Sequence, residues 1–91
     1  MQLSLFSIRD SRANCYTNPF FMPSKGAAIR AFGDEVSNQK SLLSQHPSDF
    51  ALYEHGTFDD ETGVFFAFLE PVLLSSASDF AAVGVKAAAG V

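Results

Sequence analysis

Basic and aromatic side chains are interleaved near the start of the chain, in residues 7–32. They are Arg9, Arg12, Tyr16, Phe20, Phe21, Lys25 and Arg30. Cationic side chains neutralise phosphates, and flat rings stack on bases. With Lys40 as a further cation, the pattern predicts a site that binds nucleic acid.

A purely structural alternative stays open for several of these residues. Phe20 and Phe21 lie beside prolines and could close the core from a loop. Arg9 and Arg12 could pair with Asp10 or with the acidic half of the chain. Tyr16 is expected to be exposed, because a tyrosine hydroxyl needs a polar partner.

The net charge of −4 is unevenly divided along the chain. Residues 1–40 carry five basic and three acidic side chains, a net +2, whereas residues 41–91 carry one basic and seven acidic side chains, a net −6. An acidic protein gains no long-range attraction to nucleic acid. Binding must therefore be local, and either modest or cooperative.

Patterns typical of catalytic or metal sites are weak. The acidic run at 59–61 lacks the spacing of a calcium loop and is expected to be a solvated hairpin turn. The spacing of Cys15 from His46 or His55 does not support a nucleophile pair. The glycine-rich phosphate-binding motifs are absent. We therefore expect no enzymatic activity, no cofactor and no metal.

Hydrophobic periodicity predicts a single α+β domain over residues 1–80. It consists of a small antiparallel or mixed sheet of three to four strands with one main helix packed on it, in the order β-loop-α-β-β. The expected elements are a strand at 2–9, a loop at 10–22, a helix from Lys25 to about Asn38, a strand at 50–58, a turn at 59–63 and a strand at 64–69. Residues 40–45 are expected to add a helical turn, and 72–74 a short edge strand beyond Pro71.

The helix has the clearest local signals. Ser24 is a good N-cap, and Ala28, Ile29, Phe32 and Val36 form one apolar stripe. Residues 75–80 could be helical or extended. The Ala- and Gly-rich tail at 81–91 is expected to be mobile or weakly helical.

Size and composition suggest self-association. A 91-residue chain with ten Phe and one Cys must stabilise a small core without an internal disulfide. The strand at 64–69 is apolar on both faces, so we expect the helix to cover one face and a second subunit to cover the other. We expect a homodimer. With no signal peptide and no apolar run near ~20 residues, the chain reads as cytosolic and without a membrane span.

Several short motifs, in order and across residues 2–80, resemble a known family. They are SIRDS at 7–11, Tyr16 with PFF at 19–21, GAA at 26–28 with Arg30 and Phe32, HPSDF at 46–50, and GTFDD at 56–60. The chain resembles the small nonstructural proteins of gokushoviruses, single-stranded DNA phages of the Microviridae, to which DNA binding is ascribed. The tail from Ala81 lies outside the resemblance, and no binding residues carry over from it.

The resemblance implies a protein that is absent from the virion and acts in the cytoplasm of the host bacterium. It would bind single-stranded DNA during genome replication and favour the switch to single-strand synthesis and packaging. The alternative is a protein-interaction module, whose acidic and phenylalanine-rich C-terminal half docks on a phage or host replication or packaging protein without direct DNA binding.

Overall fold

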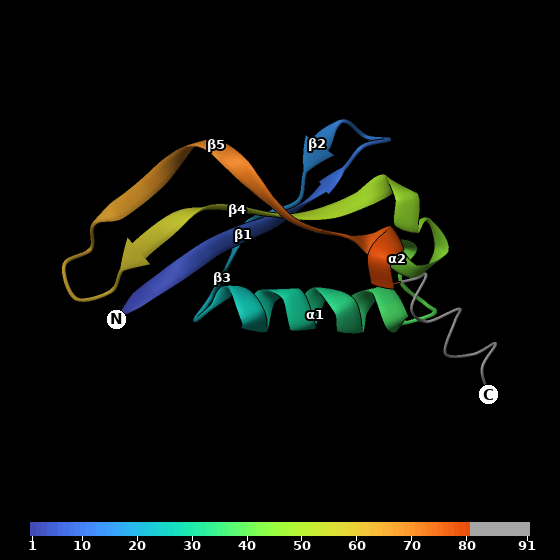
Figure 1. The fold of residues 1–91 in the computed structure, drawn as a ribbon. Coiled ribbons are helices and arrows are strands. Elements are labelled where there is room, and N and C mark those ends of the chain that lie inside the picture. Colours follow the sequence, from blue (N-terminus) through green and yellow to red (C-terminus); the bar gives the residue numbers. More distant parts are fainter. Residues whose placement is uncertain (81–91) are drawn as a thin grey trace.

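A five-stranded antiparallel sheet packs against one main helix in the computed structural model, which describes residues 1–80 (Figure 1). The α+β class expected from the sequence is confirmed. The elements are β1 (Gln2–Asp10), β2 (Cys15–Tyr16), β3 (Phe20–Met22), α1 (Lys25–Ser37), α2 (Leu42–Gln45), a 3₁₀ turn (Pro47–Asp49), β4 (Phe50–Asp59) and β5 (Phe65–Ser76). The tail at 81–91, expected to be mobile, lies outside the described residues.

β1 is the central strand of the sheet. It pairs with β4 along one edge and with both β2 and β3 along the other, while β5 lies beyond β4. The segment 10–22, expected to be a loop, therefore contributes two short strands, which raises the strand count to five. Its sequence shows no hydrophobic periodicity. Its backbone nevertheless makes the hydrogen bonds that the N–H and C=O groups on the free edge of β1 need.

Helix α1 begins and ends where the sequence predicts. The Ser24 hydroxyl accepts a hydrogen bond from the Ala27 N–H at 3.1 Å, and Asn38 is the C-cap. The helix buries its apolar stripe on one face of the sheet. The core consists of Phe6, Ala28, Phe32, Val36, Phe50, Leu52 and Ala77. This layer holds β1 and β4 rigid, which fixes the residues on the opposite face of the sheet.

The opposite face of the sheet is not covered by α1 (Figure 1). Alternate residues of β1 and β4 point to it because side chains alternate along a strand. We call it the open face and define it by Leu5, Ser7 and Arg9 of β1 and by Tyr53 and His55 of β4. The basic–aromatic segment joins it, because Tyr16 of β2 lies directly opposite Arg9.

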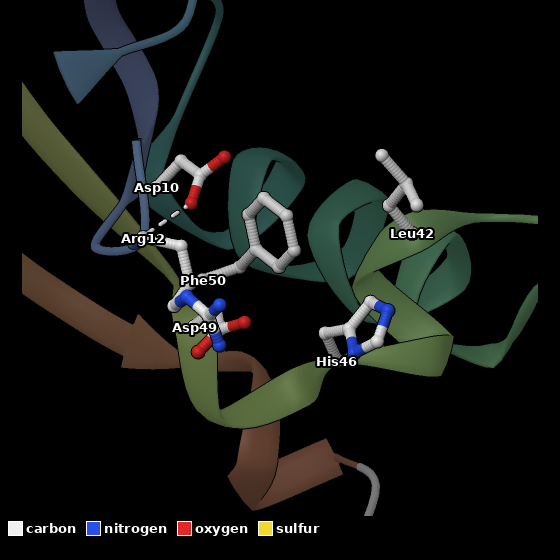
Figure 2. Close-up of a pocket in the computed structure, with 6 residues that line it drawn as sticks. All are labelled: Asp10, Arg12, Leu42, His46, Asp49 and Phe50. Carbon is white, nitrogen blue, oxygen red and sulfur yellow. Dashed lines mark hydrogen bonds between the residues drawn. The ribbon is translucent and has the colours of Figure 1, made fainter. Parts of the chain in front are cut away.

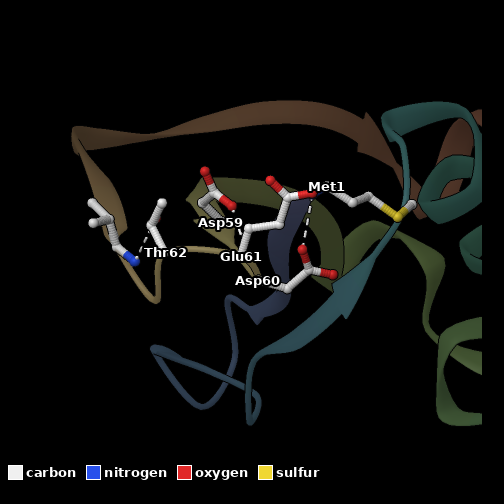
Figure 3. Close-up of polar contacts among 6 residues, drawn as sticks. Met1, Asp59, Asp60, Glu61 and Thr62 are labelled. Carbon is white, nitrogen blue, oxygen red and sulfur yellow. Dashed lines mark hydrogen bonds and ion pairs between the residues drawn. The ribbon is translucent and has the colours of Figure 1, made fainter.

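The turn at 59–63 forms the expected hairpin between β4 and β5. Gly63 has a φ of 75°, a conformation that favours glycine, and its N–H donates to the Asp59 carbonyl at 2.8 Å. A hydrogen bond from the Glu61 N–H holds the pKa of the Asp59 carboxyl below its usual value. The terminal ammonium of Met1 lies 2.9 Å from Asp60 and 3.5 Å from Glu61, which raises its pKa (Figure 3).

β5 corrects two expectations about the second half of the chain. The strand does not end at Pro71, and residues 72–74 are not a separate strand, because β5 continues to Ser76. Glu54 pairs with Val72 and Gly56 pairs with Ala67, so four residues of β5, 68–71, lie opposite the single residue His55 of β4. These four residues form a bulge in β5. Proline is tolerated at such a bulge, since its missing N–H costs no ladder hydrogen bond there.

The expected cover over residues 64–69 is also absent within residues 1–80. Val64, Phe65 and Phe66 are exposed, so the expectation that the helix packs on this segment is wrong. The apolar stripe of α1 is already used by Phe6, Phe50 and Leu52 on β1 and β4. Residues 64–69 therefore lie past the N-terminal end of α1 instead of under the helix (Figure 1).

The segment left open at 75–80 divides in two. Its first two residues belong to β5 and residues 77–80 are helical. The Phe80 ring packs edge-on against Phe32, with 5.9 Å between ring centres, and closes the end of the core. No helix in the described part of the chain is long and apolar enough to cross a membrane.

Candidate nucleic-acid interface

Arg9 and Tyr16 form the centre of the candidate site. The two residues are direct cross-strand partners, and the Arg9 guanidinium lies 5.2 Å from the centre of the Tyr16 ring. Its Nη2 also donates a hydrogen bond to the side-chain oxygen of Asn14 at 2.6 Å. Asn14 has a φ of 57° and turns the chain from β1 into β2. Because guanidinium has five N–H donors, the remaining ones can bind a phosphate.

Aromatic side chains of β4 extend this centre across the open face. The ring of Tyr16 meets the rings of Tyr53 and His55 edge-on, at centre distances of 5.5 Å and 5.3 Å. Edge-on contacts are favourable between aromatic rings and hold them in fixed orientations. Tyr16 is still 39 % exposed, so the cluster presents a ring to solvent on a rigid support.

A shallow hollow of about 250 Å³ lies beside the Tyr16 ring. Ser7, Thr17 and His55 supply polar side chains to its lining. The other lining residues are Leu5, Tyr16 and Pro19. The Ser7 hydroxyl and His55 Nε2 are hydrogen-bonded at 2.5 Å. Partial burial lowers the pKa of His55, so the imidazole is neutral at pH 7. The hollow can therefore hold a flat, uncharged group such as a base.

Thr17, which lines this hollow, is hydrogen-bonded to β1. Its hydroxyl accepts a hydrogen bond from the Ile8 N–H at 3.0 Å, and its own N–H donates to the Ile8 carbonyl at 2.8 Å. These bonds hold the otherwise exposed segment from β2 to Pro19 against the sheet. They therefore fix the backbone next to Tyr16.

Phe20 and Phe21 have different environments, as expected of neighbours in a strand. Phe21 faces the open side, is 48 % exposed and lies 5.8 Å from the Phe58 ring. Phe20 packs on Phe6 at 6.0 Å, on the helix side of the sheet. Phe21 can therefore offer a second stacking surface, whereas the placement of Phe20 favours the core role left open for it.

Arg12 lies in the turn that follows β1, three residues after Arg9. It lines a separate hollow of about 240 Å³ with Asp10, Asp49 and His46 (Figure 2). The Arg12 N–H donates to Asp10 at 3.0 Å, so the carboxylate also orders the turn. Asp10 and Asp49 line the same hollow as Arg12 and lower the positive potential there, which makes Arg12 a weaker phosphate contact than Arg9.

The remaining predicted cations lie on the helical side of the molecule. Lys25 and Arg30 are on α1 and Lys40 follows it, all exposed and across the sheet from Tyr16. The Lys25 ammonium lies 3.6 Å from the carboxylate of Glu54, which is almost fully buried on β4. The eight predicted residues therefore do not form one surface; Arg9, Tyr16 and Phe21 share the open face.

The structure adds Ser7, Tyr53 and His55 to this face. A signal for the two β4 residues was present in the sequence, since they alternate with the core residues Phe50 and Leu52. Period-two alternation places them on the face away from the core. In residues 1–80 no group of three or more His, Cys, Asp or Glu side chains is arranged to hold a metal ion.

Comparison with known proteins identifies a family but no close characterised relative. A search of curated proteins and a search of solved structures each returned no match. The family model described as "Phage ORF5 protein" matches residues 3–80, which include β2 to β5 and all of β1 except its first residue. The chain therefore belongs to the Phage ORF5 protein family.

Proposed function

We propose that this phage protein binds single-stranded DNA through the open face of its sheet. The observation that carries the proposal is the Arg9 guanidinium over the Tyr16 ring, beside the rings of Tyr53 and His55. In this arrangement Arg9 contacts a phosphate while a base stacks on Tyr16. Both interactions are available without regard to base identity, since every base has a flat face.

Single-stranded DNA fits this face better than duplex DNA. The rings of Tyr16 and Phe21 are exposed on a sheet, where unpaired bases can reach them, whereas bases in a duplex are already stacked. Among residues 1–80, Arg9 is the one cation of the open face, and the net charge of the chain is negative. We therefore propose short-range binding in which stacking contributes more than charge.

Membership of a phage family supports a role in the phage life cycle. We propose that the protein acts during genome replication in the cytoplasm of the host bacterium, outside the virion. By covering newly displaced single strands it would favour single-strand synthesis and packaging. The proposal assigns the chain a binding role and no reaction.

The test is a titration of a fluorescent oligothymidylate of about 15 nucleotides and of a duplex of equal length. It is run at about 50 and about 200 mM salt, because each phosphate neutralised on a single strand adds about 0.7 to the log–log salt slope. We expect saturable binding to the single strand, a shallow slope and weaker binding to the duplex. Absence of binding at tens of micromolar protein at the lower salt would contradict the proposal and leave the protein-interaction role as the better one.

A further inference from the structure

The hairpin of β4 and β5 projects beyond the N-terminal end of α1 (Figure 1). We call residues 57–73 the arm. Its β5 half carries large apolar side chains that are exposed: Val64, Phe65, Phe66, Leu69, Val72 and Leu73. Leu69, at the bulge, is 100 % exposed, and Phe66 is 65 % exposed. Isolated exposed apolar residues are ordinary, but six within ten residues of one hairpin are not.

Both faces of the arm are apolar. Phe65 lies opposite Phe58, and Phe66 lies opposite Thr57, so the two phenylalanines point to opposite sides of the hairpin. Neither is buried by any part of residues 1–80. β5 is also an edge strand among these residues, because its ladder partner is β4 alone. Exposed apolar edge strands are templates for pairing with another chain.

The exposed area fits a protein interface. With ~150–200 Å² for a fully exposed large apolar side chain, the six residues expose roughly 600 Å². This area is divided between the two faces of the arm. The two faces together approach the ~800 Å² that each partner of a stable complex buries, before any backbone or polar contact is added.

Charge indicates which partner fits. Residues 57–76 carry four carboxylates and no basic side chain, so the arm repels phosphate and does not extend the DNA site. Three of these carboxylates are at the turn, and only Glu70 lies within the apolar strip. A second copy of the arm is equally apolar. If the two arms run in opposite directions about a two-fold axis, their acidic turns lie at opposite ends of the contact.

We propose that the arm is the contact surface of a symmetric homodimer, in which each copy packs its exposed β5 residues against those of the other. Such pairing, on either side of the bulge at 68–71, brings the exposed side chains of the two copies into cross-strand contact and continues the sheet from one copy into the next. The open faces of the two copies then lie on the same side, so that two Tyr16 rings face one strand of DNA. The dimer itself does not depend on DNA binding.

The test is the molecular mass in solution, measured by sedimentation equilibrium from low micromolar to several hundred micromolar chain. We expect the unaltered protein to approach twice the 9.8 kDa mass of one chain. Leu69→Glu and Phe66→Glu, each placing a charge on an exposed arm residue, should remain at the mass of one chain. Leu42→Glu is the matched control, because Leu42 is 60 % exposed on α2, away from the arm, and should leave the dimer intact.

Circular dichroism of each variant checks that it is folded. Two substitutions at separate exposed positions ensure that the result does not depend on a local distortion at one of them. A single-chain mass for the unaltered protein over the whole range would overturn the proposal and leave the arm for a different protein. A dimer that survives both arm substitutions would equally overturn it, because the contact would then lie elsewhere.

Discussion

The guanidinium of Arg9 lies over the ring of Tyr16, 5.2 Å from its centre, on the face of the sheet that α1 leaves uncovered. The two residues are seven positions apart in the sequence, and the turn through Asn14 makes them cross-strand partners. A cation on an aromatic face is held in place while both groups stay accessible. This pair therefore supplies a phosphate contact and a base contact at one point.

Removing the charge of Arg9 tests its share of DNA binding. Arg9→Ala should weaken binding to oligothymidylate and reduce the log–log salt slope by about 0.7, the contribution of one phosphate on a single strand. Arg30→Ala is the matched control, since it removes the same charge from the exposed face of α1. Fluorescence titrations at several salt concentrations give both slopes. Equal losses for the two variants would show that only net charge matters.

The Tyr16 ring carries the stacking contribution. Tyr16→Ala should weaken binding by about 1–3 kcal/mol with little change in the salt slope, because an uncharged surface is lost. Tyr16→Phe keeps the ring and should bind nearly as well as the unaltered protein. If Tyr16→Phe loses as much affinity as Tyr16→Ala, the hydroxyl rather than the ring makes the contact.

Local signals explain why α1 could be predicted from the sequence almost to the residue. Ser24 caps the first turn, and Ala28, Phe32 and Val36 recur at helical spacing within thirteen residues. Strands β1 and β4 were likewise predictable from residues close together in the sequence. None of these signals depends on knowing which segments meet in space.

The missed features all depend on contacts between distant segments. β2 and β3 exist because β1 has a free edge, which the composition of 10–22 does not reveal. β5 passes through Pro71 because a bulge opposite His55 accepts it. The site shows the same division: Arg9 and Tyr16 were predicted from their residue types, whereas Tyr53 and His55 join them through the pairing of β1 with β4, more than forty residues apart.

His55 should make stability depend on pH. Desolvation lowers its pKa in the folded state below the ordinary value of 6.5, so between the two values the unfolded chain binds more protons. The free energy of unfolding should therefore fall as the pH decreases below about 6.5. It should stop falling once the pH is below the folded-state pKa of His55. Urea unfolding at a series of pH values measures this loss.

His55→Gln should flatten that acid-side loss, because it removes the titrating ring while keeping a polar group near Ser7. The same replacement at His46, which is exposed, is the control and should leave the loss in place. An unchanged pH dependence in His55→Gln would assign the loss to other groups.

Lys25 is expected to stabilise the fold rather than contact DNA. Its ammonium lies 3.6 Å from the carboxylate of Glu54, whose side chain is only 3 % exposed. Lys25→Ala leaves a buried carboxylate without its cation and should lower the free energy of unfolding by about 1–2 kcal/mol, between the values for surface and buried pairs. Lys40→Ala, at an exposed lysine, should change it by less than about 0.5 kcal/mol. Chemical denaturation of both variants gives the comparison, and equal values would show that the pair contributes little.

The close approach of β5 makes Gly56, at the base of the arm, hard to replace. A Cβ at Gly56 would lie 2.2 Å from the Phe66 carbonyl oxygen, a backbone atom that cannot move without shifting the strand. Gly56→Ala should therefore separate β4 from β5 and destabilise the protein by more than about 2 kcal/mol, as overpacking against backbone does.

Gly26→Ala is the matched control, because the nearest atom to its Cβ would be the Ser24 hydroxyl oxygen at 3.9 Å. Within α1 this replacement should leave stability unchanged or raise it by up to about 1 kcal/mol, since alanine favours the helix. Urea unfolding distinguishes the two variants directly. Because the arm also forms the proposed dimer contact, Gly56→Ala should lower the dimer fraction in sedimentation while Gly26→Ala does not. A Gly56→Ala protein as stable and as dimeric as the Gly26→Ala protein would mean that β5 can move away from β4 at little cost.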